Sequence, residues 1–269
     1  MRKSRLSQGL VSILALYLLT GISGLAVAEE APRYALVIGN SDYRHTPLKN
    51  PLNDAVDVAE VLRDLNYDVT LATNLDPKRL ARAVAKFYRA IESENAISIF
   101  YYAGHAVQVD STNYLLPVGV EFDSVDTLES ESLSLDKLLF LIRESPSQQN
   151  IIVLDACRDN PFGDLSSSDL ADLAGGLASA SSPPNTLIAY ATEPGSVSSD
   201  GSGRNGLYTG AILKYIEEAI PAEDLFKKVR RDVLAASGNR QVPWEHSSLT
   251  HTFYFGPPLN TKIKDIVSF

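Results

Sequence analysis

The sequence predicts an α/β fold, a three-layer sandwich in which a mainly parallel central sheet is flanked by helices. Strand-like and helix-like segments alternate along the chain, which implies right-handed crossovers between parallel strands. Residues 151–154 form a run of four apolar residues, typical of a strand covered on both faces. A chain of 269 residues can bury a substantial core, and one domain is expected at this size.

The first half of the chain is predicted to alternate strand and helix. Amphipathic spacing supports the helices, since Leu80, Val84, Phe87 and Ile91 recur on one face of the second one. The expected elements are a strand over 33–39, a polar loop over 40–51, a helix from 53 to about 65, a strand over 68–73, a helix from 76 or 77 to about 91, and a strand over 96–103 that breaks at Gly104.

The second half is predicted to continue this pattern with longer loops and no internal repeat. A small hairpin is expected between 107–110 and 114–117. The remaining expected elements are a helix over 135–143, the strand that leads into Cys157, a long Ser/Ala/Gly/Pro-rich segment over 159–185, a strand over 186–191, a Gly/Ser-rich loop over 195–206, helices over 207–219 and 222–235, and a short strand over 252–255.

The first 28 residues have the pattern of an export signal. Three basic residues precede an apolar run over 10–19, and Ala26-Val27-Ala28 resembles a cleavage site. We expect cleavage after Ala28, a periplasmic or secreted protein, and no stable membrane anchor afterwards. An uncleaved anchor is the alternative, although the run is shorter than the ~20 residues that a span needs.

The charge of the predicted mature chain argues against nucleic acid as a partner. Removing residues 1–28 leaves 21 basic against 33 acidic side chains, a net charge of −12. Cys157, the single cysteine, cannot form an internal disulfide in an exported chain. It is therefore either an inert buried residue or a reactive thiol.

Cys157 and His105 each follow directly from a predicted strand. Ligands gather beyond the carboxyl ends of parallel strands, so neighbouring strands would bring the thiol and the imidazole to one edge. That is the minimum for a thiolate nucleophile with a histidine partner. Taken singly, a buried histidine and a buried small hydrophobic residue are the alternatives.

Six short motifs extend this interpretation to most of the chain. In order they are Tyr34-Ala-Leu-Val-Ile-Gly-Asn-Ser-Asp-Tyr43, Asn50-Pro-Leu-Asn-Asp-Ala55, Tyr101-Tyr-Ala-Gly-His105, Leu154-Asp-Ala-Cys-Arg-Asp-Asn-Pro-Phe162, Tyr190-Ala-Thr-Glu-Pro-Gly195 and Arg240-Gln-Val-Pro-Trp244. On these residues the chain resembles bacterial caspase-like cysteine peptidases, relatives of the metacaspases and orthocaspases. The separation of 52 positions between His105 and Cys157 also agrees with a histidine ~50 residues before the nucleophile.

The resemblance implies a caspase-hemoglobinase-like fold for a single peptidase domain over 29–269. Within it we expect a large-subunit-like part over 33–162, a flexible linker over 163–185 and a small-subunit-like part over 186–256.

The resemblance also implies a cysteine endopeptidase with Cys157 as nucleophile and His105 as general acid/base. The backbone amides of Cys157 and Ala106 would form the oxyanion hole. The family usually has glycine where this chain has Ala106, and a positive φ there would cost alanine about 1 kcal/mol or move the amide. A catalytically weak or silent binding or scaffold protein of the same fold is therefore the alternative.

Three aspartates indicate which substrates such an enzyme would cleave. Caspases that cut after aspartate use pocket arginines and a glutamine; here Asp155 matches the glutamine, and Asp54 and Asp200 match the arginines. The inverted charge predicts a peptide or protein substrate with arginine or lysine at the cleavage site, arginine being favoured by its bidentate geometry. Asp54 as a helix-start residue, Asp155 as a loop-fixing residue and Asp200 as a solvated residue are the alternatives.

The positions of the basic residues predict whether the enzyme would cut its own chain on activation. No lysine or arginine occurs from 159 to 203. An enzyme that cleaves after basic residues could not cut itself there, so we expect a single-chain active form.

No cofactor is expected, although calcium is conceivable because some metacaspases need it. Glu121, Asp123 and Asp126 cluster after the predicted hairpin, and a solvated acidic face is the alternative explanation for them. No zinc site is predicted at the other histidines, His45, His246 and His251, because no cysteine accompanies them at ligand spacing.

Two further expectations concern a serine hydrolase as an alternative and the surroundings of Trp244. A serine hydrolase on a similar sheet is disfavoured, because no Gly-x-Ser-x-Gly elbow follows a strand. Trp244, which follows Pro243, is expected to be a packed aromatic residue near the substrate loops.

Overall fold

The computed structural model describes residues 31–92, 95–157, 161–162, 170, 177–178, 180–193 and 203–256, with only the backbone of Cys157. The predicted export signal and Asp200 lie outside these residues. None of the described helices combines the length and apolar character that crossing a membrane requires.

The sheet is mainly parallel, as the alternation of elements predicted. Its main path runs in the order β2 (Asp68–Thr73), β1 (Arg33–Gly39), β3 (Ile97–Val109), β6 (Gln149–Cys157), β7 (Thr186–Tyr190) and β8 (Trp244–Ser247). Only β8 is antiparallel on this path. The predicted hairpin is present, since β4 (Thr112–Leu115) pairs antiparallel with the end of β3, and β5 (Leu133–Ser134) pairs with β4.

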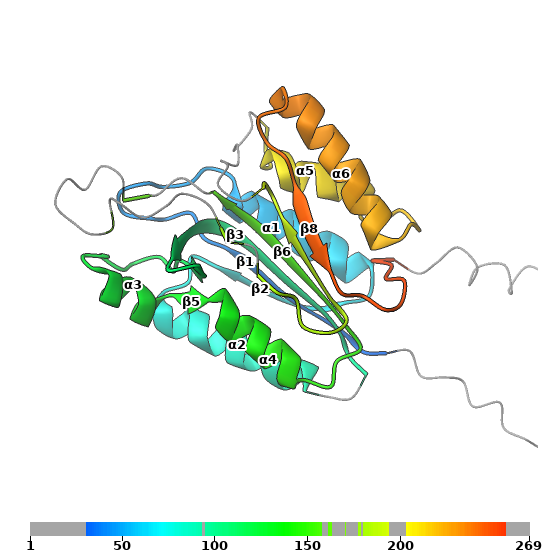
Figure 1. Ribbon diagram of the computed structural model, residues 1–269, viewed down its shortest axis with the longest axis horizontal. Coiled ribbons are helices and arrows are strands. Elements are labelled where there is room, and N and C mark those ends of the chain that lie inside the picture. The colour runs from blue at the N-terminus through cyan, green and yellow to red at the C-terminus, as the bar shows by residue number, and fades with distance from the viewer. Residues whose placement is uncertain are drawn as a thin grey trace, which may run out of the picture. The chain divides into compact units, whose positions relative to one another are not determined.

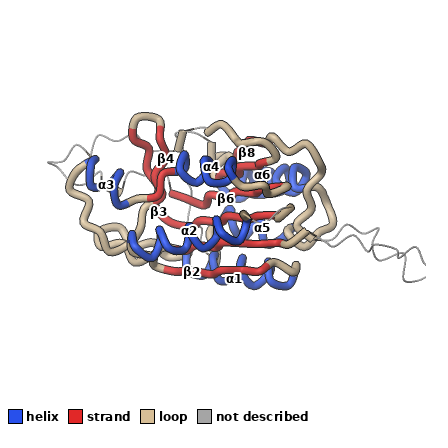
Figure 2. The backbone as a smooth tube through the Cα atoms, turned by 90° about the horizontal axis from the view of Figure 1, so that it is seen from below, coloured by secondary structure: helices blue, strands red, loops and turns tan. Residues whose placement is uncertain are grey.

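Helices cover both faces of the sheet, which confirms the three layers. One face packs against α1 (Pro51–Asp64), α5 (Leu207–Tyr215) and α6 (Ala222–Ser237), and the other against α2 (Pro77–Ile91) and α4 (Leu135–Glu144) (Figure 1). Viewed at 90° to this, the strands lie between the two sets of helices (Figure 2). Neighbouring residues of one strand therefore enter different cores: Tyr101 packs under α1 and α5, and Phe100 under α2 and α4.

Local signals set where several helices begin and end. Asp76 accepts a hydrogen bond from the Arg79 amide at the start of α2, and Ser134 accepts one from the Lys137 amide at the start of α4. Helix α6 stops at Gly238, whose φ of +63° is the left-handed conformation that favours glycine.

Two elements differ from the sequence prediction for reasons of packing. The last strand is Trp244–Ser247, not 252–255, because the apolar alternation of Phe253 and Phe255 is used in aromatic packing against α6. The true edge strand is polar and largely exposed, so it lacked an apolar pattern. Helix α3 (Val125–Glu131) was not predicted, since only Leu128 of its residues is buried.

The segment over 163–185 was predicted to be a flexible linker, and some of its described residues pack on the domain. Leu170 and Leu177 are buried. Ala178 donates its amide to the Asn113 side chain at 2.6 Å and accepts from the same side chain at 2.8 Å. Flexibility of the linker as a whole stays a prediction.

Candidate active site

His105 and Cys157 occupy opposite positions on neighbouring parallel strands. Strands β3 and β6 pair without interruption from Ile97 opposite Gln149 to His105 opposite Cys157. Adjacent strands are separated by about 4.8 Å. The two residues thus form the last pair between these strands, which confirms that the strands are neighbours and that both residues lie at one edge of the parallel sheet.

Gly104 determines how β3 passes this edge. The strand does not end at 103 as predicted but continues to Val109, and Gly104 has a φ of +157°. A Cβ at this position would lie 2.6 Å from the Tyr43 hydroxyl and 2.8 Å from the Tyr102 hydroxyl. Only glycine fits here, because both hydroxyls lie against its α-carbon.

The same two hydroxyls fix the backbone of His105. Its amide donates to the Tyr43 hydroxyl at 3.0 Å, and the Tyr102 hydroxyl donates to its carbonyl at 2.7 Å. The ring of Tyr43 also packs against the imidazole, with centroids 4.4 Å apart. The role of these tyrosines was not predicted, although each belongs to one of the six sequence motifs.

Thr46 orients the imidazole and selects its tautomer. The His105 Nε2 atom lies 2.8 Å from the Thr46 carbonyl oxygen and 3.0 Å from its hydroxyl, and the side chain is buried. A carbonyl oxygen can only accept a hydrogen bond, so Nε2 carries the proton in the neutral ring. The basic nitrogen is then Nδ1.

Ala106 lies in strand β3 and has no positive φ. The condition for a strain cost at this alanine is therefore not met, and the unusual backbone is two residues earlier, at Gly104. Ala106 stands opposite Leu115, and the adjoining bond runs from the Leu116 amide to the His105 carbonyl at 3.0 Å. In an antiparallel pair this arrangement directs the Ala106 amide away from β4, towards the side of β3 on which β6 lies.

Asp54 and Asp155 converge on one point although they come from different elements, α1 and β6. A Cβ added to Gly206 would lie 3.2 Å from an oxygen of Asp54 and 3.4 Å from an oxygen of Asp155. Asp54 accepts the Gly206 amide at 2.9 Å, and Asp155 accepts the Thr209 hydroxyl at 2.6 Å. The structure thus brings two of the three predicted pocket aspartates together, and we use the name acidic recess for these two carboxyl groups and the Gly206 backbone between them.

The acidic recess disfavours ionisation of Asp54. Burial raises the pKa of Asp54 to about 7, the Asp155 carboxylate adds to the rise, and hydrogen bonds from Gly206 and Asn205 oppose it. Burial and the same two carboxylates raise the pKa of Tyr101 well above its ordinary value. A cation bound here would relieve this repulsion.

A clamp that sequence analysis missed holds residues 203–206 against α1. Arg204 binds Asp57 with two hydrogen bonds of 2.9 and 2.8 Å, and Asn205 donates to the same carboxylate at 2.9 Å. Asn53 donates to the Arg204 carbonyl at 3.1 Å. The sequence feature that could have indicated this contact is the spacing of Asn53 and Asp57, which are four residues apart on one helix face.

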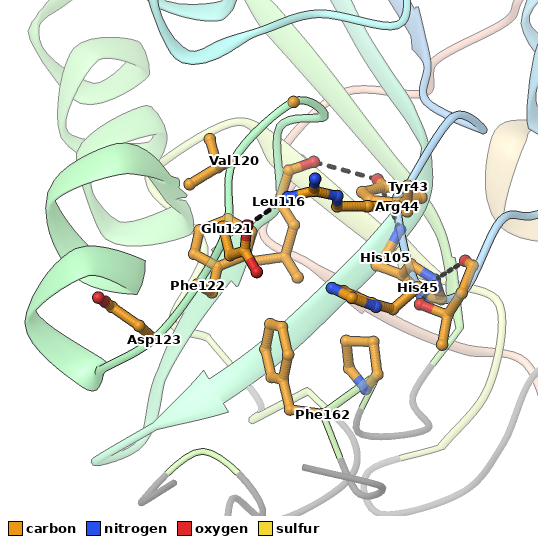
Figure 3. A pocket seen from close by; sticks show the side chains of 13 residues that line it. Tyr43, Arg44, His45, His105, Leu116, Val120, Glu121, Phe122, Asp123 and Phe162 are labelled. Carbon is orange, nitrogen blue, oxygen red and sulfur yellow. Dashed lines mark hydrogen bonds and ion pairs between the residues drawn. The ribbon is translucent and has the colours of Figure 1, made fainter.

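A cavity of about 480 Å³ lies beside His105, and it was also not predicted (Figure 3). His105 and Tyr43 contribute to one side, residues 119–123 to another, and Phe162 faces them from a third. None of the residues that form the acidic recess lines it.

The acidic residues considered for calcium have local partners. Glu121 forms an ion pair with Arg44, and Asp123 accepts hydrogen bonds from Thr127 and Ser124 at the start of α3. Asp126 lies in the first turn of that helix. Within the part of the chain that is described, no three His, Cys, Asp or Glu residues are grouped to hold a metal ion.

Trp244 is not the packed aromatic residue that the sequence predicted. It begins β8 at the edge of the sheet, and 48% of it is exposed. Its neighbour Glu245 is the more buried residue, because it pairs with Arg230.

Comparison with known proteins agrees with this architecture. The family model Peptidase_C14, the caspase domain, matches residues 32–254. The chain is 27% identical over 190 residues to the human mucosa-associated lymphoid tissue lymphoma translocation protein 1, a match that covers 70% of this chain and 22% of the human protein. The mouse homologue matches equally, at 27% identity over 70% of this chain and 21% of its own length. The chain thus spans about a fifth of these relatives and, by its matched residues and its sheet, belongs to the caspase-domain family.

Proposed function

We propose that this protein is a cysteine endopeptidase in which Cys157 is the nucleophile and His105 the general acid/base. The observation that supports this most is the register of β3 and β6, which sets the two residues opposite each other at the carboxyl edge. The Thr46 carbonyl supports it further, since it leaves Nδ1 of His105 as the basic nitrogen.

The proposed reaction proceeds in two halves. His105 takes the thiol proton of Cys157, and the sulfur attacks the scissile carbonyl to give a tetrahedral oxyanion bound by the Ala106 and Cys157 amides. Collapse breaks the C–N bond while His105 returns the proton to the leaving amine, which leaves a thioester. Water, deprotonated by His105, then attacks the thioester, and breakage of the C–S bond releases the acid and restores the thiol.

We further propose that the acidic recess selects arginine, and more weakly lysine, before the scissile bond. Two carboxylate oxygens that approach one point suit a guanidinium, which donates in a planar fork. Asp200 stays a third candidate for this role. The partner is accordingly a peptide or protein with a basic residue at the cleavage site, encountered after export and removal of residues 1–28.

Hydrolysis of fluorogenic peptides tests this function. The mature protein should cleave peptides ending in arginine and leave matched aspartyl peptides intact, and Cys157→Ala should lose at least ~10³-fold in kcat/KM. Equal activity of the Cys157→Ala variant would contradict the nucleophile. Folding of this variant is checked by its unfolding midpoint in urea.

The alternative of a silent scaffold protein gains no support from the site. This alternative was considered because of expected backbone strain at Ala106, and the backbone there is an ordinary strand.

A further inference from the structure

The cavity beside His105 lies where a peptide substrate would place its leaving group. A general acid must come within hydrogen-bond reach of the leaving nitrogen, so that nitrogen would sit next to the His105 ring. The same ring forms part of the cavity wall. The acidic recess shares no lining residue with the cavity, so the two can receive the side chains on either side of one scissile bond.

The interior of the cavity is suited to an apolar side chain. Leu116, Val120, Phe122 and Phe162 line it, and the rings of Phe122 and Phe162 meet edge to face with centroids 5.6 Å apart. A further ring inserted here would extend this aromatic contact. The volume of about 480 Å³ lies within the usual range for pockets that bind small ligands.

The arginine and the two carboxylates that line the cavity already have partners. Arg44 and Glu121 form an ion pair and are 68% and 64% exposed, which puts their charges at the mouth rather than at the base. Asp123 is engaged by two hydroxyls of α3 and its N-cap. An acidic side chain entering the cavity would therefore lose hydration while Arg44, the arginine that borders the cavity, is already engaged by Glu121.

We propose that this cavity is the subsite for the residue directly after the scissile bond and that it selects a large apolar or aromatic side chain there. The inference rests on the proposed peptidase function and adds a second determinant of specificity to the acidic recess. Substrates would then be cut between a basic residue and a large apolar residue.

Internally quenched peptides test this subsite with the mature protein. All carry arginine before the scissile bond and differ only in the next residue: glycine, aspartate, leucine or phenylalanine. We expect kcat/KM for phenylalanine and leucine to exceed that for glycine by about 10-fold or more, with aspartate lowest.

Variants locate the preference in the cavity. Phe162→Ala should bring the phenylalanine-to-glycine ratio close to one, whereas Phe140→Ala, a matched change at a residue 60% exposed on α4, should leave the ratio unchanged. Val120→Lys, on the loop that borders the cavity, should raise aspartate above phenylalanine. The Val120→Lys variant still tests the subsite if Phe162→Ala does not fold.

The outcomes separate this inference from the function on which it rests. Cleavage after arginine at equal rates for all four peptides would overturn the subsite and leave the peptidase intact. Failure to cleave any arginyl peptide would instead contradict the peptidase, and the subsite with it.

Discussion

At the scale of single residues, Gly104 connects the fold to the site. Its α-carbon lies against two tyrosine hydroxyls that also bind the backbone of His105. A larger residue would have to displace those hydroxyls and therefore His105.

We expect Gly104→Ala to lower the free energy of unfolding by about 2–4 kcal/mol, since it adds steric overlap to an unfavourable φ. Gly119→Ala is the matched control, because Gly119 has a φ of +76° and nothing within 4 Å of its Cβ position, so it should cost only about 1 kcal/mol. Urea unfolding measures both. Equal losses for the two variants would show that the contact with the hydroxyls is unimportant.

Asp54 is expected to make the stability of the folded protein depend on pH. Its pKa is about 7 in the folded protein against an ordinary value of 3.8, so the folded state disfavours the ionised form. Between pH 4 and 7 the folded state binds more protons than the unfolded state, and stability falls as the pH rises through this window.

Asp54→Asn removes that titration and can keep an oxygen acceptor for the Gly206 amide. The variant should therefore gain stability relative to the wild type from pH 4 to pH 8, as measured by urea unfolding at each pH. It should also lose about 10- to 100-fold in kcat/KM for arginyl peptides at pH 8, the effect of one charged hydrogen bond. A stability difference independent of pH would contradict the buried, raised pKa.

At the scale of elements, the site depends on segments that meet only in the folded chain. The pairing of β3 with β6 near His105 and Cys157 was predictable, because the apolar run of each strand ends two or three residues before the side chain with chemistry. Two other features were not predictable, because they involve residues in irregular segments. They are the orientation of the imidazole by Thr46 and the position of Gly206 between two aspartates. Helix α3 and strand β8 escaped prediction because few of their residues are buried.

The clamp of residues 203–206 on α1 predicts a positioning effect. Arg204→Ala should raise KM for arginyl peptides several-fold with kcat changed less than about 2-fold, because it loosens the Gly206 amide that binds Asp54. Arg204→Lys should restore part of the loss. Lys227→Ala, which breaks the exposed pair with Asp224, is the control and should change neither constant. A loss in kcat alone would rule out a positioning role.

At the scale of the whole molecule, one mainly parallel sheet separates two apolar cores, and the acidic recess, the His105–Cys157 pair and the cavity beside His105 lie near its carboxyl edge. The sequence predicted the layers well, since buried strands and amphipathic helices have strong patterns. It did not predict the cavity, whose lining comes from loops separated by more than a hundred residues.

The distribution of basic residues predicts that the active molecule is a single chain. No lysine or arginine occurs from 159 to 203, and Arg204 is held by Asp57 and Asn53. Purified mature protein incubated in its active state should remain one species in denaturing electrophoresis and intact mass measurement. Two discrete fragments produced by a cut within that segment would refute this prediction.

The most direct test of the account is covalent capture by a chloromethyl ketone that carries a Phe-Arg peptide, read by mass spectrometry of the intact mature protein. We predict one adduct, located on Cys157, that forms at least ten times more slowly in His105→Ala and in Asp54→Asn and is not seen with the aspartyl reagent. An adduct at any other residue, or equal labelling of wild type and His105→Ala, would contradict a cysteine activated by this histidine.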